Sequence, residues 1–368
     1  MKTARNLSDY RAYLAELDYP EYAHAYSRRK KPIETRDDLP ILDLSLWGDT
    51  IHPGMVEVIR KAMLSISKYQ ESQDPELLAG MAARFGYPKK SISIVAGADD
   101  ALRIAAQYCI RPGSRVLIPV PSFGRYEYHA YINEADIHYL RFDQYPYRID
   151  VRKVAEYANK HNIECIFLAN PNSPTGSAIP AEEIKYLLES VTAAVILDES
   201  LLIESKGSVS PKLLKEHENL FVCGSFSKLF SLAGVRIGYL VVNPKHQAAV
   251  GQLVSPFEVS VLGIALAKFV LQREEWSDFK AAQIKKGIAK LRNFEHPSFR
   301  VSETCAPIAL LEYIGPSKQD LHEMLKKEGI LTISGKNFRG LENANAVRII
   351  IRNERDITQL LRRLQKIP

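Results

Sequence analysis

The stretch Phe221–Val242, FVCGSFSKLFSLAGVRIGYLVV, decides how the rest of the chain is interpreted. Its two flanks, Leu220–Cys223 and Tyr239–Val242, are apolar runs typical of buried strands. Lys228 is therefore expected on the connection between two strands of one sheet. An amine held rigidly there, among small hydroxyl side chains, is suited to forming a Schiff base if donors for a phosphate lie nearby. Taken alone, Lys228 is better explained as an ordinary solvated surface lysine, and only the rest of the chain overturns that explanation.

Length and composition fit a large cytoplasmic protein. The 368 residues, 46% of them hydrophobic, can bury an extensive core and are expected to form two domains. Since no apolar run approaches the ~18 residues of a membrane helix, we expect no membrane partner. The amino-terminal residues show no apolar segment typical of a secretory signal. Cysteines 109, 165, 223 and 305 lie far apart without a C-x-x-C pair. We expect them to be reduced core cysteines.

The net charge of +6 is modest. The basic cluster Arg28–Lys31 is interpreted as a solvated arm rather than a nucleic-acid site. No appended helix-turn-helix module is evident, and the pattern shows no internal repeat.

Strand and helix patterns alternate along the middle of the chain, which indicates a three-layer α/β fold with a mostly parallel sheet. We expect an arm over residues 1–50 that packs on the small domain, a large domain over 51–258, and an interdomain helix with a small α+β domain over 259–368. The expected strands are 41–46, 92–96, 115–119, 137–142, 165–169, 194–198, 308–313, 330–334 and 346–352. The expected helices begin at Pro53 and cover 75–85, 99–109, 151–160, 181–190, 259–292 (with a possible interruption at 274–277), 317–327 and 356–365.

Ligands bind at the carboxyl ends of strands in such sheets, and the candidate chemistry falls there. Gly97-Ala98-Asp99 follows a strand and opens a helix, so its N–H groups can hold a phosphate, although Asp99 also fits a plain N-cap. Asn170–Gly176, NPNSPTG, forms a rigid turn whose polar side chains can reach a ligand; a purely structural turn stays possible. Asp198 ends an apolar strand, where a carboxylate needs a cation or donor such as a protonated pyridine nitrogen.

In order, the motifs Gly97–Asp99, Asn170–Gly176, Asp198-Glu199, Ser225–Lys228 and Ala233–Gly238 resemble class I and II aminotransferases of pyridoxal-phosphate fold type I. The histidinol-phosphate aminotransferase branch is the most similar. The tail, with Asn337–Leu341 and Val347–Arg352, also resembles threonine-phosphate decarboxylase of that superfamily. The resemblance spans about residues 40 to 366.

The resemblance implies a role for each matching residue, with pyridoxal 5'-phosphate as the cofactor. Lys228 bonds covalently to the cofactor and moves the proton at the substrate's α-carbon, and Asp198 keeps the pyridine nitrogen protonated. Arg348 holds the substrate carboxylate in preference to Arg352, and Trp47 lies in the segment that lines the substrate site. Tyr69 reaches the phosphate of a neighbouring subunit, which implies a homodimer. The remaining cofactor contacts are Gly97, Ala98, Asp99, Phe123 (otherwise a core residue), Asn172 or Ser173, Ser225, Ser227 and Arg236.

Three positions depart from the family pattern. Ser173 stands where an asparagine usually bonds the cofactor's phenolic oxygen, and Leu201 stands where a tyrosine bonds the same oxygen. Leu46–Thr50 replaces an Asn-Glu-Asn-Pro stretch of the substrate pocket. We therefore expect an aminotransferase acting on a polar or phosphorylated amino compound. A pyridoxal-phosphate decarboxylase or side-chain-modifying enzyme is the first alternative. A non-catalytic binding protein is disfavoured because Lys228 and Asp198 are both present.

Overall fold

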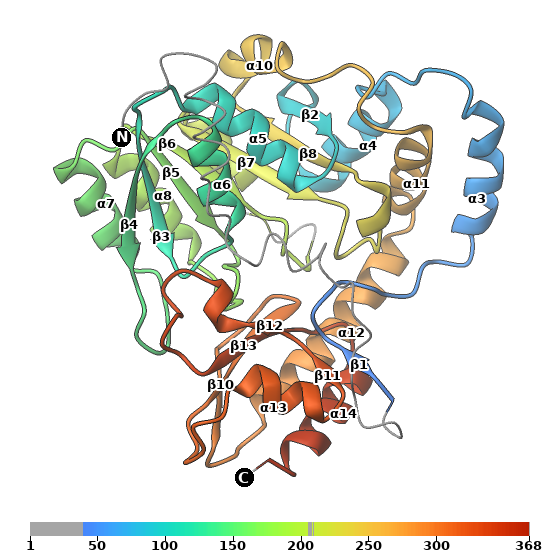
Figure 1. Cartoon of the computed structure of the whole chain (residues 1–368). Helices are drawn as coiled ribbons and strands as arrows, with labels where there is room; N and C mark the ends of the chain where they lie inside the picture. Colours follow the sequence, from blue (N-terminus) through green and yellow to red (C-terminus); the bar gives the residue numbers. More distant parts are fainter. Residues whose placement is uncertain (1–39, 205–207, 209, 368) are drawn as a thin grey trace, which may run out of the picture.

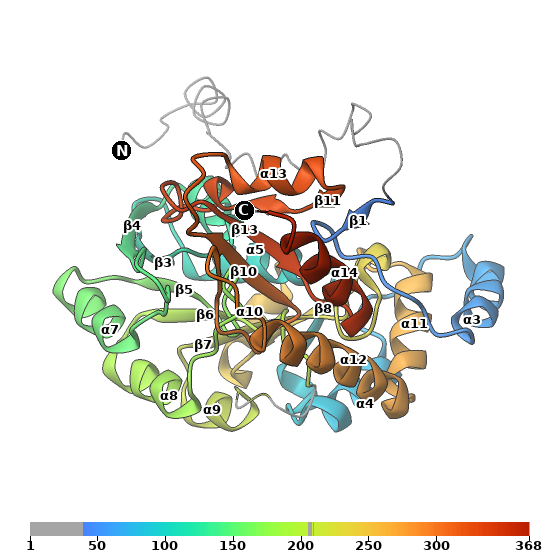
Figure 2. The same ribbon diagram turned by 90° about the horizontal axis from the view of Figure 1, so that it is seen from below.

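The computed structural model describes residues 40–204, 208 and 210–367. The basic cluster at 28–31 and most of the expected arm lie outside these residues. Figures 1 and 2 show a larger part built around one twisted sheet, with a smaller part packed against one end of it.

Among the described residues, the sheet of the larger part has seven strands. Its strand order places β5, β6 and β7 side by side, so the polar residues that follow them lie at one edge. β8 is antiparallel to both of its neighbours, and the remaining neighbours pair in parallel. The mostly parallel sheet expected from the sequence is thereby confirmed. In spatial order the strands are β2 (Ile92–Val95), β8 (Gly238–Val242), β7 (Leu220–Ser225), β6 (Ala194–Asp198), β5 (Cys165–Ala169), β3 (Arg115–Val120) and β4 (Asp136–Arg141).

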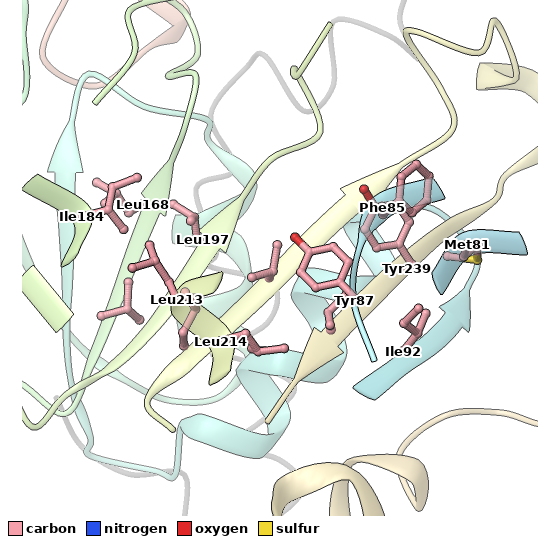
Figure 3. Close-up of a cluster of buried hydrophobic side chains, with 14 of the residues drawn as sticks. Met81, Phe85, Tyr87, Ile92, Leu168, Ile184, Leu197, Leu213, Leu214 and Tyr239 are labelled. Atoms are coloured by element: carbon pink, nitrogen blue, oxygen red, sulfur yellow. The ribbon is translucent and has the colours of Figure 1, made fainter. Parts of the chain in front are cut away.

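Helices cover both faces of this sheet because successive strand residues point to opposite sides. On β5, Ile166 belongs to one buried cluster and Phe167 to the other. The first cluster is covered by α4 (Pro75–Phe85), α7 (Val151–Lys160), α8 (Ala181–Ser190), α9 (Ser210–Glu216) and α11 (Val261–Leu271). The second is covered by α5 (Ala98–Cys109), α6 (Arg125–Ile132) and α10 (Pro244–Gly251). Figure 3 shows part of the first cluster, in which the rings of Phe85 and Tyr239 stack at 5.0 Å.

The smaller part is an α+β unit with its own core. Its antiparallel sheet has the order β12 (Ile333–Ser334), β13 (Ala346–Ile350), β10 (Ile308–Tyr313) and β9 (Phe299–Val301). Its helices are α12 (Glu274–Arg292), α13 (Leu321–Lys327) and α14 (Glu354–Leu364). β1 (Leu42–Asp43) pairs in parallel with β11 (Ile330–Leu331), so these residues of the amino-terminal segment pack on the smaller part.

The remaining elements are α3 (Met55–Ala62) and four 3-10 turns, η1 (Met63–Ser65), η2 (Lys89–Ser91), η3 (Ala233–Val235) and η4 (Gly335–Asn337). No helix among the described residues is long and apolar enough to cross a membrane.

Several elements differ from those expected. The sequence pattern did not predict α6, α9, α10 or β9, and the expected helix 259–292 is two helices, α11 and α12. α11 packs on α3 and α4 within the first cluster of the larger part. The expected division into an arm and two domains stays a prediction. Cys305 is exposed, so the expectation of a core position was wrong for this residue, while Cys165 and Cys223 are buried. Cys305 lies on the loop before β10, where no apolar periodicity places a side chain inward.

Candidate active site

Lys228 lies on the turn that joins β7 to β8, as the sequence predicted. The turn is anchored by Phe226, which is fully buried and donates its backbone N–H to the carbonyl of Ile237 at 3.2 Å. Ser231 donates its N–H to the Lys228 carbonyl at 3.1 Å. The amine nitrogen lies 5.3 Å from the centre of the Trp47 ring, which comes from the segment crossing the smaller part. These contacts fix the backbone on both sides of the lysine and aim its amine between the two parts.

The surroundings of Lys228 favour a neutral amine. Desolvation, together with the positive charges of Arg348 and Arg236, lowers the pKa of the Lys228 amine to about 7, and the carboxylate of Asp198 opposes this change. A surface lysine keeps its charge at neutral pH, whereas an amine with a pKa near 7 is a competent nucleophile and base there. The explanation of Lys228 as an ordinary solvated lysine therefore loses its support.

Asp198 is buried at the carboxyl end of β6. Its Oδ1 accepts the backbone N–H of Ser200 at 2.8 Å, and its Oδ2 accepts the hydroxyl of Tyr126 at 2.9 Å. Desolvation raises the pKa of the Asp198 carboxyl, while the hydrogen bonds from Ser200 and Tyr126 act in the opposite direction. A buried carboxylate with two donors and lone pairs to spare can accept one more proton donor from a ligand.

An anion cradle is formed where α5 begins. Its N-cap is Gly97, with φ +97°, and a Cβ at this position would lie 2.6 Å from Nη2 of Arg236. Arg236 itself has φ +55°, an uncommon conformation for arginine, and donates Nη1 to the carbonyl of Ala233 at 2.9 Å. Since the first N–H groups of a helix lack intrahelical partners, this end of α5 and the guanidinium together suit a phosphate.

The side chain of Asp99 has a different role from the plain N-cap considered for it. Arg125 binds its carboxylate through two bonds of 2.7 and 2.9 Å, and Nε2 of His129 lies 3.0 Å from it. Desolvation opposes ionisation, but the bonds from His129 and Arg125 prevail and hold the pKa of Asp99 below its usual range. Of the groups on Ala98 and Asp99, the backbone N–H groups therefore remain the candidates for phosphate contacts.

The structure separates the two candidate residues of the NPNSPTG turn. Asn172 is buried and donates its amide nitrogen to the carbonyl of Pro121 at 3.0 Å and to Oγ1 of Thr175 at 3.1 Å. Both amide hydrogens of Asn172 therefore have partners, one outside the turn and one within it, which favours Ser173 as the candidate for a cofactor oxygen. On the other side, Phe123 is partly buried, and its ring meets that of Tyr126 edge to face at 5.7 Å.

The two arginines of the tail differ clearly. Arg348 is buried on β13, and its Nη2 donates to the carbonyl of Ser45 at 2.6 Å. Arg352 lies beyond the end of β13 and bonds Asp356 at 2.7 Å and the carbonyls of Gly48 and Asp43 at 2.9 and 2.8 Å. Arg348 also shifts the pKa of Lys228, as noted above, whereas Arg352 holds the amino-terminal segment in place. The geometry favours Arg348 over Arg352 as the substrate ligand.

Ser225 and Ser227 stay beside the lysine, and the N–H of Ser227 donates to Oγ of Ser225 at 2.9 Å. Tyr69 is not brought to this site within one chain. It is 89% exposed and packs only its ring against Phe257, at 5.2 Å.

Tyr126 is the site residue that sequence reasoning missed. It lies on α6, which the pattern did not predict, and its hydroxyl reaches the Asp198 carboxylate. The available signal was its spacing: it stands three residues after Phe123, on the same side of any helix that begins there.

Comparisons with known proteins agree with this geometry. The model of the family described as aminotransferase class I and II matches residues 48–364. A histidinol-phosphate aminotransferase from Methanothermobacter thermautotrophicus is 26% identical over 352 residues, covering 93% of this chain and 91% of that protein. Among solved structures, histidinol-phosphate aminotransferase from Sinorhizobium meliloti in complex with pyridoxal-5'-phosphate superposes with a TM-score of 0.80 at 18% identity, covering 100% of this chain and 99% of that one. L-threonine-O-3-phosphate decarboxylase from Porphyromonas gingivalis gives 0.73 at 24% identity, covering 89% and 99%. At these identities the structural likenesses show the shared fold.

Proposed function

Because the chain belongs to the class I and II aminotransferase family, we propose that it transfers the amino group of a polar or phosphorylated amino acid or amine. It is a pyridoxal-phosphate enzyme, and the cofactor when bound supplies an electron sink for the pair of electrons released at the substrate's α-carbon. The observation that carries the proposal is the position of Lys228 on the turn between β7 and β8, with its amine 5.3 Å from the centre of the Trp47 ring. The charges of Arg348, Arg236 and Asp198 act on that amine, whose pKa is about 7.

The residues present fit this cofactor. Its phosphate suits the cradle of Gly97 and Arg236, where a Cβ on residue 97 would collide with the guanidinium. The hydroxyls of Ser225 and Ser227 lie at the carboxyl end of the adjacent β7. The buried carboxylate of Asp198 suits a ring N–H, and Phe123 is proposed as the aromatic side chain that stacks on the cofactor ring.

Each side chain then has a defined task during the reaction. Lys228, as the neutral amine, accepts the α-proton and returns it on the opposite step. Arg348 orients the substrate carboxylate with its planar guanidinium, in place of the carbonyl of Ser45 that it now binds. Trp47 and Leu201, which pack together with small-domain residues, exclude water from the side of the substrate.

Decarboxylation is the second candidate, and one observation favours it. Leu201 is buried among Ala306, Ile308 and Ile350, so no donor at residue 201 reaches the cofactor oxygen that a tyrosine usually bonds in this family. The likeness to the Porphyromonas gingivalis decarboxylase supports this reading only weakly, since it shows no more than the fold.

A single-turnover experiment separates the two reactions. Holoenzyme is mixed with each member of an amino-acid panel, including histidinol phosphate and threonine phosphate, without a keto-acid acceptor. We expect one equivalent of oxo product per active site, conversion of the cofactor to its amine form, and no carbon dioxide. Carbon dioxide release with the cofactor unchanged would establish decarboxylation instead. Lys228→Ala serves as the inactive control.

We also propose that two copies of the chain form a homodimer with shared active sites. Large apolar side chains are exposed on and beside α3, which Figure 1 shows at the outer edge of the molecule. They are Val56, Met63, Leu64, Ile66, Tyr69 and Phe257. In a homodimer that buries them, Tyr69 reaches the phosphate of the partner subunit. Leu64→Asp should yield a monomer by light scattering and weaken cofactor binding; a Leu64→Asp protein that stays dimeric rules out this face.

A cytoplasmic location also belongs to the proposal. Its support is that the four cysteines are free, with Cys165 and Cys223 buried.

A further inference from the structure

Helix α6 connects three parts of the site that are distant in sequence. On one side it holds the start of α5: Arg125 and His129 both bind Asp99, two residues after Gly97 of the anion cradle. The His129 side chain is 2% exposed, whereas the Asp99 side chain that it binds is 42% exposed. Arg125 in the first turn and His129 one turn later therefore hold α6 to the phosphate-binding end of α5.

Tyr126, the second residue of α6, supports the buried carboxylate of Asp198. The Tyr126 ring stacks on Phe167 of β5 at 5.4 Å, which orients its hydroxyl toward Oδ2 of Asp198 at 2.9 Å. A hydrogen bond from a phenol to a buried carboxylate stabilises the ionised form and depends steeply on distance and angle. Small movements of α6 therefore alter how strongly Asp198 holds its charge.

On its far side, α6 is bound to the smaller part. Glu127 follows Tyr126 directly, and its carboxylate receives two bonds from Arg339, at 3.0 and 2.5 Å. The Glu127 side chain is only 6% exposed, and the Arg339 guanidinium also lies over the ring of Tyr139 at 4.3 Å. The ion pair is bidentate, with its carboxylate buried and its guanidinium partly exposed, and the bidentate geometry fixes orientation as well as charge.

The loop that carries Arg339 also packs against the segment leading into α6. Gly340 has φ +91°, and a Cβ there would lie 3.3 Å from the nitrogen of Pro121, so the backbones approach closely. Phe123 packs on the small-domain cluster that contains Phe338 and Leu341. Figure 1 shows this loop, between β12 and β13, reaching the ends of β3 and β4.

We propose that α6 is a coupling helix, in which Arg339 and Glu127 are positioning residues that hold Tyr126 against Asp198. The position of the smaller part, which carries Arg348, is thereby transmitted to the carboxylate that faces the cofactor ring. The inference rests on the proposed function, because it assigns a purpose to Asp198. Glu127 and Tyr126 are neighbours on one helix, so displacement of one carries the other with it.

The test uses holoenzyme variants Tyr126→Phe, Arg339→Gln and the double variant. We expect Tyr126→Phe to lower kcat about ten-fold, the loss typical of one hydrogen bond to a charged group, and to change the circular dichroism of the bound cofactor. Arg339→Gln should change the same dichroism band and lower kcat by roughly three-fold or more. In the Tyr126→Phe background, Arg339→Gln should add less than about two-fold, because residues that act through one contact are not additive.

The matched control is the pair Arg141 and Glu342, which joins the same two parts at 2.8 Å but touches the end of β4 rather than α6. Arg141→Gln should leave the dichroism band and kcat unchanged. The inference is overturned if Arg339→Gln leaves the cofactor's dichroism band as in wild type. It is also overturned if the fold-loss of kcat in the double variant equals the product of the losses in the two single variants. A wild-type holoenzyme that turns over no amino compound would instead contradict the proposed function. Arg339 is 40% exposed, so its variant is expected to fold.

Discussion

The two walls on either side of Lys228 are built in different ways. We call the site residues of the larger part the large-domain wall. They lie at strand ends and at a helix start: Asp198 ends β6, Ser225 ends β7, and Gly97 precedes α5. We call the site residues on the other side the small-domain wall. They are Arg348, in the interior of β13, and Trp47, in the amino-terminal segment that crosses the smaller part. We propose that the first wall binds the cofactor and that the second binds the substrate.

The strongest test of this comparison removes the charge from the large-domain wall. Asp198→Asn keeps the shape and loses the carboxylate that holds a ring proton. We expect kcat to fall roughly 10²-fold or more, as when a positioned charge is removed from a developing ionic centre. Cofactor content, measured by absorbance per protein, should fall much less. Turnover close to wild type would show that this wall does not control the cofactor's electronics.

The next test addresses the small-domain wall. Arg348→Lys keeps the charge and loses the planar fork, so KM for carboxylated substrates should rise about ten-fold, the size of one charge-assisted hydrogen bond. The analogous Arg352→Lys should leave KM unchanged. It should instead lower the free energy of unfolding by about 1–2 kcal/mol, since Arg352 binds Asp356 and two backbone carbonyls. If the two variants exchange these phenotypes in steady-state kinetics, the assignment of the tail is wrong.

The pH dependence of cofactor capture reports on both walls. The Lys228 pKa is lowered from 10.5 to about 7, so the reactive neutral amine is scarce below this pH and abundant above it. In cofactor-free protein, stopped-flow absorbance should show covalent capture of added pyridoxal phosphate rising through about pH 7. Arg348→Gln removes a positive charge that lowers this pKa, so its midpoint should move upward. Arg352→Gln is the control with the same change in charge, and an equal movement there would contradict the local explanation.

The smallest effect concerns the missing donors to the cofactor's phenolic oxygen. Weaker support for that anion leaves its bound proton in place to higher pH. Leu201→Tyr with Ser173→Asn should therefore lower the pH midpoint of the bound cofactor's absorption band by about half a unit to one unit. Ser173→Asn alone leaves the packing around Leu201 intact and should give part of the change. Identical midpoints in all three proteins would mean that these departures have no effect on the cofactor.

Strand positions in the large sheet were predictable because its inner strands, such as β5 and β6, are buried on both faces and consist of apolar runs. The edge strand β4 is only partly buried, and it was expected one residue later than it lies. Helix α6 was not, and the reason is physical. Its sequence RYEYHAYI buries Tyr126, Glu127 and His129, so polar residues occupy the positions that apolar residues fill in an ordinary amphipathic helix. The pattern fails where the helix serves the site rather than the core.

The site residues, too, could be predicted from the sequence only in part. Lys228 and Asp198 could be predicted because the strand-end rule places them at one edge. The partnerships of Tyr126 with Asp198 and of Glu127 with Arg339 join residues 72 and 212 positions apart, and no local pattern encodes such distances. The hydrogen bond of Asn172 to the carbonyl of Pro121 likewise joins residues 51 positions apart, so the sequence alone could not rank Asn172 and Ser173 as candidates.

The central claim is that Lys228, held between these two walls, is the residue that binds the cofactor covalently. The direct measurement is borohydride reduction of the protein with bound pyridoxal phosphate, followed by proteolysis and mass spectrometry of the peptides. We expect a single phosphopyridoxyl adduct on Lys228, and its loss in Lys228→Ala. An adduct on another lysine, such as the buried Lys280 that pairs with Asp49, would contradict the assignment of the whole site.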